Sequence, residues 1–409
     1  MKSAPPEVVL SGVGITAAIG QGKAAFGAAL MRGNHAFRVM QRPGRQRGSA
    51  YLGAELPQQT WPEQISKRLL RTATLSGQVA LATLHEAWVD AQLDAVDPLR
   101  IGLIAGGSNF QQREQVLVHD EYASRIEYLR PSYALSFLDT DVCGLCTEQF
   151  AIQGFAHTLG AASASGQLAV LHAIEAVGSG KVDVCIALGA LMDLSYWECQ
   201  GLRTAGAMGS DRYANEPELA CRPFDRSRDG FIFGECCGVV VVERRDHAVA
   251  RRVRPYASAA GWGTAIDRNR NPDPSLQGEI RAIRTALAAA DLAPRDIDYI
   301  NPHGSGSVIG DDLELQAIRS CELSHALINA TKSITGHGLS AAGAVEIVAT
   351  LLQMRESCLH PSRNLEQPMD PDLNWVGAAA RAHDISHALT LSIGFGGINS
   401  ALCLRRWQG

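Results

Sequence analysis

The chain has 409 residues, of which 46% are hydrophobic and 19% charged, and its formal net charge at pH 7 is −5. This length and composition exclude a disordered chain and favour two domains or one large duplicated unit with a deep core. The scattered basic residues exclude a broad nucleic-acid-binding surface, and no apolar run reaches the roughly 18 residues of a membrane span. The N-terminal stretch lacks a secretory signal pattern, so we expect a cytoplasmic protein.

The first part of the chain alternates short apolar stretches with Ala- and Leu-rich stretches, which is typical of mixed α/β layers. Buried strands are predicted at 8–14, 100–107 and 183–190. A helix is predicted at 72–93, where apolar residues recur at spacings of three and four. A second buried helix is predicted at 165–180, which ends on glycine and is followed at once by a strand.

Ten cysteines occur in the chain, and we interpret them as reduced thiols in a core rich in small residues. Cys143 and Cys146 form a CxxC motif. A zinc site would need a second ligand pair at a suitable spacing, and the sequence has none. We therefore interpret the two cysteines as incidental residues near a loop or a helix start, and we expect no metal site.

A second series of segments repeats the order of the first from about residue 253. The matching segments are, in order, the strand 255–265, the helix 278–292, the strand 296–306, the helix 339–353 and the strand 388–397. The order of five elements carries this inference, because single short apolar matches arise by chance. The sequence therefore predicts two βαβαβ-type halves, 1–252 and 253–409.

Four short strings place small residues around a polar group at a strand end or a helix start. They are AASASG at 161–166, NPHGSGS at 301–307, TKSITGHG at 331–338 and IGFGGIN at 393–399. Ser163 lies where a loop enters a helix, so free backbone N–H groups and the positive end of the helix dipole face it. Such a position stabilises a developing anion.

Two histidines, His303 and His337, stand beside glycines in loops. Neutral imidazoles held side by side can donate Nε2–H hydrogen bonds to a carbonyl oxygen that becomes an enolate, as decarboxylation requires. Spacing alone leaves open that they are unrelated loop histidines. Lys332 can orient a histidine or fix a loop, although a lone lysine is usually a solvated surface charge. IGFGG can bring a backbone N–H to a ligand, or it can be a plain tight turn.

Six motifs in order resemble the β-ketoacyl synthase family over almost the whole chain, from about residue 7 to residue 406. The motifs are VVLSGVG, ASASG, RPFDRSRDGFIFGE at 222–235, NPHGSGS followed by Asp311 and Glu314, KSITGH with AAGAVE, and GFGGIN. The resemblance implies a thiolase-like duplicated α/β/α/β/α layered fold and a homodimer or related pairing. It also implies no tightly bound cofactor, and an acyl group delivered on the phosphopantetheine of an acyl carrier protein.

The resemblance also implies a role for each matching residue. Ser163 occupies the position of the family's nucleophilic cysteine, while His303 and His337 polarise the malonyl thioester carbonyl. Lys332 supports them, Glu346 is a buried acid, and Phe395 is a gate residue whose backbone N–H forms an oxyanion hole with that of Ser163. The remaining implied residues are Asp225, a structural acid of the dimer or pocket scaffold, and the substrate-binding residues Gly394, Gly396, Ser305 and Ser307.

Other departures from the family pattern exchange small residues. GECCG at 234–238 replaces the usual GEGAG, and GHGLSAAG replaces GHTLGAAG. We expect Cys236 and Cys237 to reshape packing more than chemistry.

Serine at position 163 changes the expected reaction. A cysteine thiol ionises near neutrality beside a helix N-terminus, whereas a serine needs a strong general base, and no string offers a carboxylate beside either histidine. Decarboxylation needs only the two histidines. The sequence thus resembles the malonyl-carrier-protein decarboxylases of polyketide β-branching, which supply acetyl groups to an HMG-CoA-synthase-like partner.

Two alternatives stay open at this point. One is a condensing β-ketoacyl synthase or acyltransferase that uses Ser163 as a slow nucleophile. The other is a non-catalytic partner subunit resembling a chain-length factor, although retention of both histidines and Lys332 argues against a purely structural role.

Overall fold

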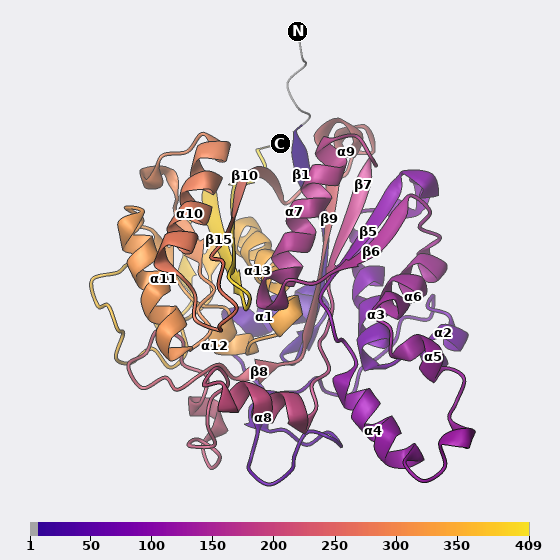
Figure 1. Ribbon diagram of the computed structural model, residues 1–409. Coiled ribbons are helices and arrows are strands. Elements are labelled where there is room, and N and C mark those ends of the chain that lie inside the picture. The colour runs from indigo at the N-terminus through magenta and orange to yellow at the C-terminus, as the bar shows by residue number, and fades with distance from the viewer. Residues whose placement is uncertain (1–6, 409) are drawn as a thin grey trace.

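The computed structural model describes residues 7–408, and these form one layered α/β structure around a long central sheet (Figure 1). The strand order in this sheet is β12-β11-β15-β16-β10-β1-β9-β7-β5-β6, and β2 pairs with β1. The strands of the sheet are β1 (Val8–Ala17), β2 (Gly20–Gln21), β5 (Ile101–Gly106), β6 (Phe155–Leu159), β7 (Val184–Gly189), β9 (Cys236–Arg244), β10 (Ala257–Ile266), β11 (Tyr299–Asn301), β12 (Leu327–Ile328), β15 (His387–Gly394) and β16 (Ile398–Arg406).

The sheet consists of two halves with the same pairing pattern. In the first half β9 is antiparallel to both β1 and β7, and β5 is parallel to β7 and β6. In the second half β16 is antiparallel to both β10 and β15, and β11 is parallel to β15 and β12. The halves meet where β1 pairs with β10 through Val9–Ser258 and Leu10–Ala257. The two halves of the sheet therefore share one strand topology.

Helices cover the half-sheets and also separate them. Between the half-sheets lie α7 (Ser165–Gly178) and α13 (Ala342–Glu356), which pack against each other. The outer faces are covered by α3 (Leu75–Asp90) with α6 (Thr140–Phe150), and by α10 (Leu276–Ala290) with α11 (Val308–Ser320); Figure 1 shows the two pairs on opposite sides of the molecule. These five layers are those of the thiolase-like fold that the sequence resemblance implied.

Strands buried on both faces explain the continuous apolar runs in the sequence. Along β7, Val184 and Ile186 belong to the core beneath α3 and α6, whereas Cys185 and Ala187 belong to the core beneath α7 and α13. Successive strand residues point to opposite faces, so a strand covered on both sides must be apolar at every position. The apolar stretch at 183–190 therefore marks a central strand.

Glycines permit the close approach of the two middle helices. A Cβ atom at Gly166 of α7 would lie 2.8 Å from the backbone nitrogen of Ala344, and one at Gly343 of α13 would lie 2.7 Å from that of Gln167. Larger residues would force the helices apart. Because α7 begins just after Ser163, this crossing fixes the serine relative to the second half of the chain.

The remaining elements are short or peripheral. The helices are α1 (Lys23–Met31), α2 (Lys67–Thr72), α4 (Gln112–Tyr122), α5 (Tyr133–Ser136), α8 (Tyr196–Thr204), α9 (Arg245–Ala250) and α12 (Lys332–Thr335). The strands are β3 (Phe37–Val39), β4 (Leu52–Ala54), β8 (Phe233–Gly234), β13 (Cys358–Leu359) and β14 (Arg381–Ala382). In residues 7–408, none of the helices has the length and apolar character needed to cross a membrane.

Two local expectations differ from the structure. The helix predicted at 72–93 begins at Leu75, after a break that separates it from α2. The strand predicted at 296–306 is limited to Tyr299–Asn301, because the chain then turns to present a loop at the strand end. Cys143 and Cys146 lie in the first two turns of α6, close to the helix start as interpreted from the sequence; both are buried, and burial raises the pKa of the Cys143 thiol to about 11.

Candidate active site

A cavity of about 390 Å³ lies where the two halves meet, and it brings together residues that are far apart in the sequence. Ser163 and Phe231 line it from the first half, and His303, His337 and Phe395 line it from the second. Their elements end at the same edge of the sheet, where strand ends and helix starts converge. The cavity is therefore built from side chains of both halves.

Ser163 lies in a single turn of 3-10 helix, Ala162–Ala164, directly before α7. Ala162 has a φ of 47°, a left-handed conformation that is uncommon for a non-glycine residue. Ser165 holds the turn, since its hydroxyl accepts the N–H of Ala161 at 2.8 Å and donates to the carbonyl of Ala162 at 2.7 Å. The strained turn therefore presents the Ser163 side chain to the cavity, ahead of the helix N-terminus.

His303 follows β11 in a loop that two buried carboxylates hold. Glu314 accepts the backbone N–H groups of His303 at 2.5 Å and of Gly304 at 2.8 Å. Asp311 accepts those of Ser305, Gly306 and Phe224. Burial raises the pKa of Asp311 to about 6 and that of Glu314 to about 8. The two carboxylates of α11 thus fix the backbone of this loop.

His337 follows α12 and is paired with a short strand of the first half. Its backbone N–H donates to the carbonyl of Ile232 at 2.7 Å, and its carbonyl accepts the N–H of Gly234 at 3.1 Å. The two backbones approach so closely that a Cβ at Gly234 would lie 2.0 Å from the carbonyl oxygen of Thr335. Phe231 packs edge-on against the imidazole, with ring centroids 5.0 Å apart.

The hydrogen bonds of both imidazoles assign the same tautomer to each. The Nδ1 atom of His337 accepts the backbone N–H of Leu339 at 3.3 Å, and the Nδ1 atom of His303 lies 3.4 Å from the Nζ of Lys332. A neutral imidazole whose Nδ1 accepts carries its proton on Nε2. Each ring therefore offers an Nε2–H donor, and the ring centroids are 5.3 Å apart with the planes nearly perpendicular.

The environment keeps both histidines neutral. Burial and the charge of Lys332 lower the pKa of His303 and that of His337 well below the usual value, and His337 adds to the effect on His303. Two adjacent imidazolium ions beside a lysine would repel one another. The site is thus a pair of neutral hydrogen-bond donors across the range around pH 7.

Lys332 links His303 to the middle layer of the fold. Its ammonium group donates to the backbone carbonyl of His303 and forms a buried ion pair with Glu346 of α13. Burial raises the pKa of Glu346 to about 7, although Lys332 acts in the opposite direction. The lysine thereby positions the His303 loop and supplies positive charge close to both imidazoles.

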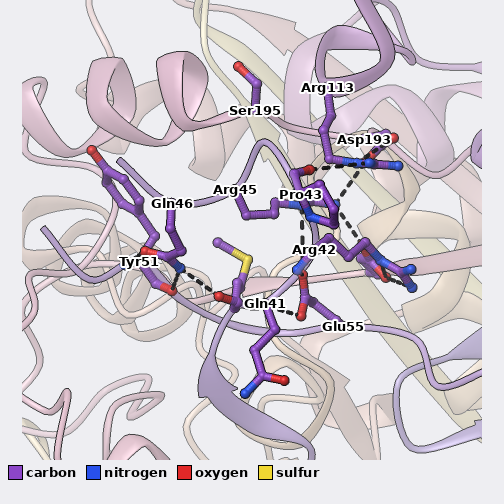
Figure 2. Close-up of polar contacts among 12 residues, drawn as sticks. Gln41, Arg42, Pro43, Arg45, Gln46, Tyr51, Glu55, Arg113, Asp193 and Ser195 are labelled. Carbon is purple, nitrogen blue, oxygen red and sulfur yellow. Dashed lines mark hydrogen bonds and ion pairs between the residues drawn. The ribbon is translucent and has the colours of Figure 1, made fainter. Parts of the chain in front are cut away.

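A second buried charge cluster contacts Phe233, which pairs with His337. Figure 2 shows Arg42, Arg45, Arg113 and Asp193 of this cluster. Arg45 is fully buried and donates to Asp193 at 2.8 Å and to Glu235 at 2.6 Å, and its guanidinium stacks on Phe233. Arg42 and Arg113 complete the cluster as further partners of Glu235 and Asp193. Phe233 bridges to His337, so this cluster fixes the strand on which the histidine rests.

The other residues proposed from the sequence occupy distinct places. Phe395, Gly394, Ser305 and Ser307 line the cavity. Gly396 lies in the turn after β15 with a φ of 91°, and Gly397, not Gly396, lines the cavity. Asp225 lies outside the cavity and accepts N–H groups of Ser227, Glu366 and Gln367, so it ties two loops of the scaffold together. Although burial acts in the opposite direction, these bonds and Arg222 lower the pKa of Asp225.

Several site residues had no assigned role in the sequence analysis. Phe231 and Glu235 lie in the motif RPFDRSRDGFIFGE, so a signal for them was present. Arg45 and Asp193 had none, because a charged stretch such as QRPGRQR is typical of an exposed loop. Among residues 7–408 no group of three or more His, Cys, Asp or Glu side chains is arranged to hold a metal ion.

Comparison with known proteins gives one consistent result. The N-terminal domain of β-ketoacyl synthases matches residues 6–248, and the C-terminal domain matches residues 256–366. The chain is 60% identical to the polyketide biosynthesis malonyl-ACP decarboxylase PksF of Bacillus subtilis, over 98% of this chain and 96% of that protein.

Solved structures of synthases share the fold over the whole chain. A β-ketoacyl synthase from Burkholderia phymatum is 28% identical, with a TM-score of 0.87 over 98% of this chain and 100% of that one. A ketosynthase, AntDE, in complex with its type II polyketide acyl carrier protein AntF is 26% identical, with a TM-score of 0.87 over 99% of this chain and 100% of that one.

Proposed function

Because this chain belongs to the β-ketoacyl synthase family, we propose that it decarboxylates malonyl-acyl carrier protein to acetyl-acyl carrier protein in bacterial polyketide biosynthesis. The 60% identity to a malonyl-ACP decarboxylase over almost the full length supports this activity. The enzyme is a ketosynthase-like decarboxylase, and its acetyl product suits β-branching.

The pair of Nε2–H donors carries the proposal. When a malonyl thioester loses CO₂, negative charge moves onto its carbonyl oxygen as the enolate forms. Two preorganised donors aimed at that oxygen stabilise this charge, while a positively charged donor would risk protonating it. His303 and His337 have the required tautomer and neutral state. Lys332 and Glu346 position the donors without contacting the thioester.

The same hydrogen bonds argue against a condensing enzyme. The Nε2 of His337 lies 3.1 Å from Oγ of Ser163, but this nitrogen already carries the proton and cannot accept one from the serine. In an enzyme with a serine nucleophile, a histidine accepts the hydroxyl proton. A carboxylate hydrogen-bonded to the other nitrogen of that histidine stabilises the imidazolium. Here a backbone N–H occupies that nitrogen, so an acyl-serine is not expected.

We assign the remaining residues by their places around the cavity. The N–H groups of Ser163 and Phe395 would form an oxyanion hole, and Gly394 allows the close approach of their turns. Ser305 and Ser307 would contact the phosphopantetheine arm that carries the malonyl group, with Gly396 near its entry. No tightly bound cofactor is needed for this chemistry.

We further propose an acyl carrier protein as partner, a homodimer and an HMG-CoA-synthase-like enzyme that uses the product, all in the cytoplasm. The complex of the similar ketosynthase AntDE with its carrier protein supports the first. The position of β6 supports the homodimer, because β6 ends the sheet with an edge that a second copy of the chain can extend. Light scattering of the purified protein tests the dimer, and a monomer at working concentration would contradict it.

The activity is tested by mass spectrometry of malonyl-loaded carrier protein after incubation with wild type, Ser163→Ala and His303→Ala. We expect wild type to form acetyl-carrier protein, the serine variant to retain most of this activity, and the His303 variant to lose about 100-fold or more. His172→Ala, at an exposed histidine, is the matched control and should resemble wild type.

Each alternative predicts a different result. A mass increment on Ser163 after incubation with acyl thioesters would indicate a condensing enzyme or acyltransferase. Absence of CO₂ release by the protein alone would favour a non-catalytic partner subunit. A loss in Ser163→Ala equal to that in His303→Ala would show that the serine is needed for carbon–carbon cleavage.

A further inference from the structure

Decarboxylation by the route proposed above is incomplete until the new carbanion receives a proton. The two histidines cannot supply it without ending their hydrogen bonds to the enolate oxygen, and their low affinity for a second proton leaves them no spare one. The source of this proton determines whether the enzyme controls the last step or leaves it to solvent.

Ser163 is the hydroxyl closest to the reacting atoms. Of the described residues, it alone places a hydroxyl in hydrogen-bond contact with an Nε2 atom of this histidine pair, at 3.1 Å from His337. A thioester oxygen bound at the same Nε2 has its α-carbon two bonds away. Proton transfer to that carbon requires a separation from Oγ of roughly 3–3.5 Å, and a shared contact with Nε2 places both groups on the same side of His337.

The direction of the hydrogen bond leaves the serine proton free. The Nε2 of His337 is the donor to Oγ, because its Nδ1 accepts the N–H of Leu339. Ser163 Oγ is thus an acceptor in this bond, and its own proton points elsewhere. Three other acids line the cavity: both oxygens of Asp311 and of Glu314 accept backbone N–H groups, and Asp273 is exposed.

We propose that the hydroxyl of Ser163 protonates the α-carbon of the enolate, so that the residue at the nucleophile position acts as an acid; this rests on the proposed decarboxylase function. The bond between the α-carbon and the carboxylate breaks and CO₂ leaves with the electron pair remaining on the enolate. The α-carbon then takes the proton from Oγ, giving the acetyl thioester. A water molecule from the cavity returns a proton to the Ser163 alkoxide, and the hydroxide formed combines with CO₂ as bicarbonate.

The surroundings of Ser163 suit the short-lived alkoxide. It lies two residues before the fourteen-residue helix α7, whose N-terminus favours negative charge. Once the α-carbon is protonated the thioester oxygen is no longer charged, so the Nε2–H of His337 can return to Oγ, its partner at 3.1 Å in the structure. A cysteine here would lose its proton near neutrality under the same helix terminus. A serine hydroxyl stays protonated, so the substitution keeps a transferable proton where the family has a nucleophile.

The test follows the geometry of the new methyl group. Carrier protein is loaded with malonyl whose α-carbon bears one protium and one deuterium in known configuration, and the reaction is run in tritiated water. A proton delivered by Ser163 reaches one face of the enolate, so wild type should give acetate with a single methyl configuration. Ser163→Ala should give acetate with a racemic or inverted methyl group, whatever its rate of CO₂ release.

Two further variants separate the serine's hydroxyl from its packing. Ser163→Thr keeps a hydroxyl and should keep the wild-type configuration, even if the rate falls. Ser108→Ala, outside the cavity lining, is the matched control and should also keep it. A racemic product from wild type, or an unchanged configuration in Ser163→Ala, would overturn the proton transfer while leaving decarboxylation intact. Absence of any acetyl product from wild type would overturn both proposals.

Discussion

The Sγ atom of Cys236 lies 2.1 Å from the place where a Cβ atom at Gly338 would be. Cys236 stands in β9 where related synthases have glycine, and Gly338 follows His337 where they have threonine. The two departures therefore compensate each other. The space left by the missing side chain at Gly338 is filled by the sulfur atom of Cys236. Close packing of the interior permits one of these side chains but not both.

We expect Gly338→Thr alone to destabilise the fold by about 1–3 kcal/mol, since the added side chain collides with Cys236. Cys236→Gly alone should also destabilise it by leaving a gap in a buried strand. The double variant should recover part of both losses. A double-mutant cycle measured by urea denaturation should then give a coupling energy of about 0.5–3 kcal/mol. Additive losses would show that the residues do not compensate each other.

Gly394→Ala should disturb the serine turn. The new Cβ would lie 2.3 Å from the carbonyl oxygen of Ala161, and backbone atoms at that distance must move. We expect a loss of stability of about 1–3 kcal/mol and a larger fall in kcat than change in KM for acetyl-carrier-protein formation. Gly201→Ala in α8 is the control, because its Cβ would meet no atom within 4 Å; it should stabilise the helix by about 0.5–1 kcal/mol.

We expect Arg45→Met to lower the free energy of unfolding strongly, because Arg45 is fully buried. The substitution removes the arginine that pairs with both Glu235 and Asp193, and breaking a buried ion pair costs about 3–5 kcal/mol. Arg68→Met removes an exposed pair with Glu148 and should change stability by at most about 1 kcal/mol. Urea denaturation of both variants measures the difference; equal small effects would mean that Arg45 does not hold the cluster.

The fold was predictable where a strand is buried on both faces and its sequence is therefore continuously apolar, as at 183–190. β11 was harder, because only Tyr299–Asn301 extend before the chain bends toward Glu314. β9 and β16 were missing from the predicted series, although GVVVVER and INSALCL carry the same apolar signal. The interpretation of 165–180 as a buried helix was confirmed as α7, because its small and apolar residues meet other layers on several sides.

The site was predictable only in part, for a physical reason. Ser163, His303 and His337 lie in glycine-rich strings at element ends, so the sequence marks them. Arg45 gives no such mark, because its burial depends on Asp193 and Glu235, which are 148 and 190 residues away along the chain. The tautomer of His337 likewise depends on one backbone N–H, and no sequence pattern specifies it.

His360 gives a pH dependence that can be isolated. It is fully buried, with Nδ1 hydrogen-bonded to the carbonyl of Pro361 at 2.9 Å and Nε2 to the hydroxyl of Thr331 at 3.1 Å. Burial lowers its pKa to about 4, against a slight opposing effect of the Pro361 carbonyl. Thr331 precedes Lys332, so this histidine supports the segment that carries the site lysine.

We expect His360→Gln to become more stable relative to wild type as the pH falls. Below about pH 6.5 the unfolded chain takes up a proton on His360, while the folded protein keeps it neutral down to about pH 4. The contribution of the neutral histidine to the free energy of unfolding is complete above pH 6.5. About 3 kcal/mol of that contribution is lost between pH 6.5 and pH 4. Glutamine can form both hydrogen bonds without titrating. Urea denaturation of the two proteins across this range measures the difference, with His172→Gln at an exposed site as control. A difference that stays constant with pH would show that His360 gains its proton in the folded protein as readily as in the unfolded chain.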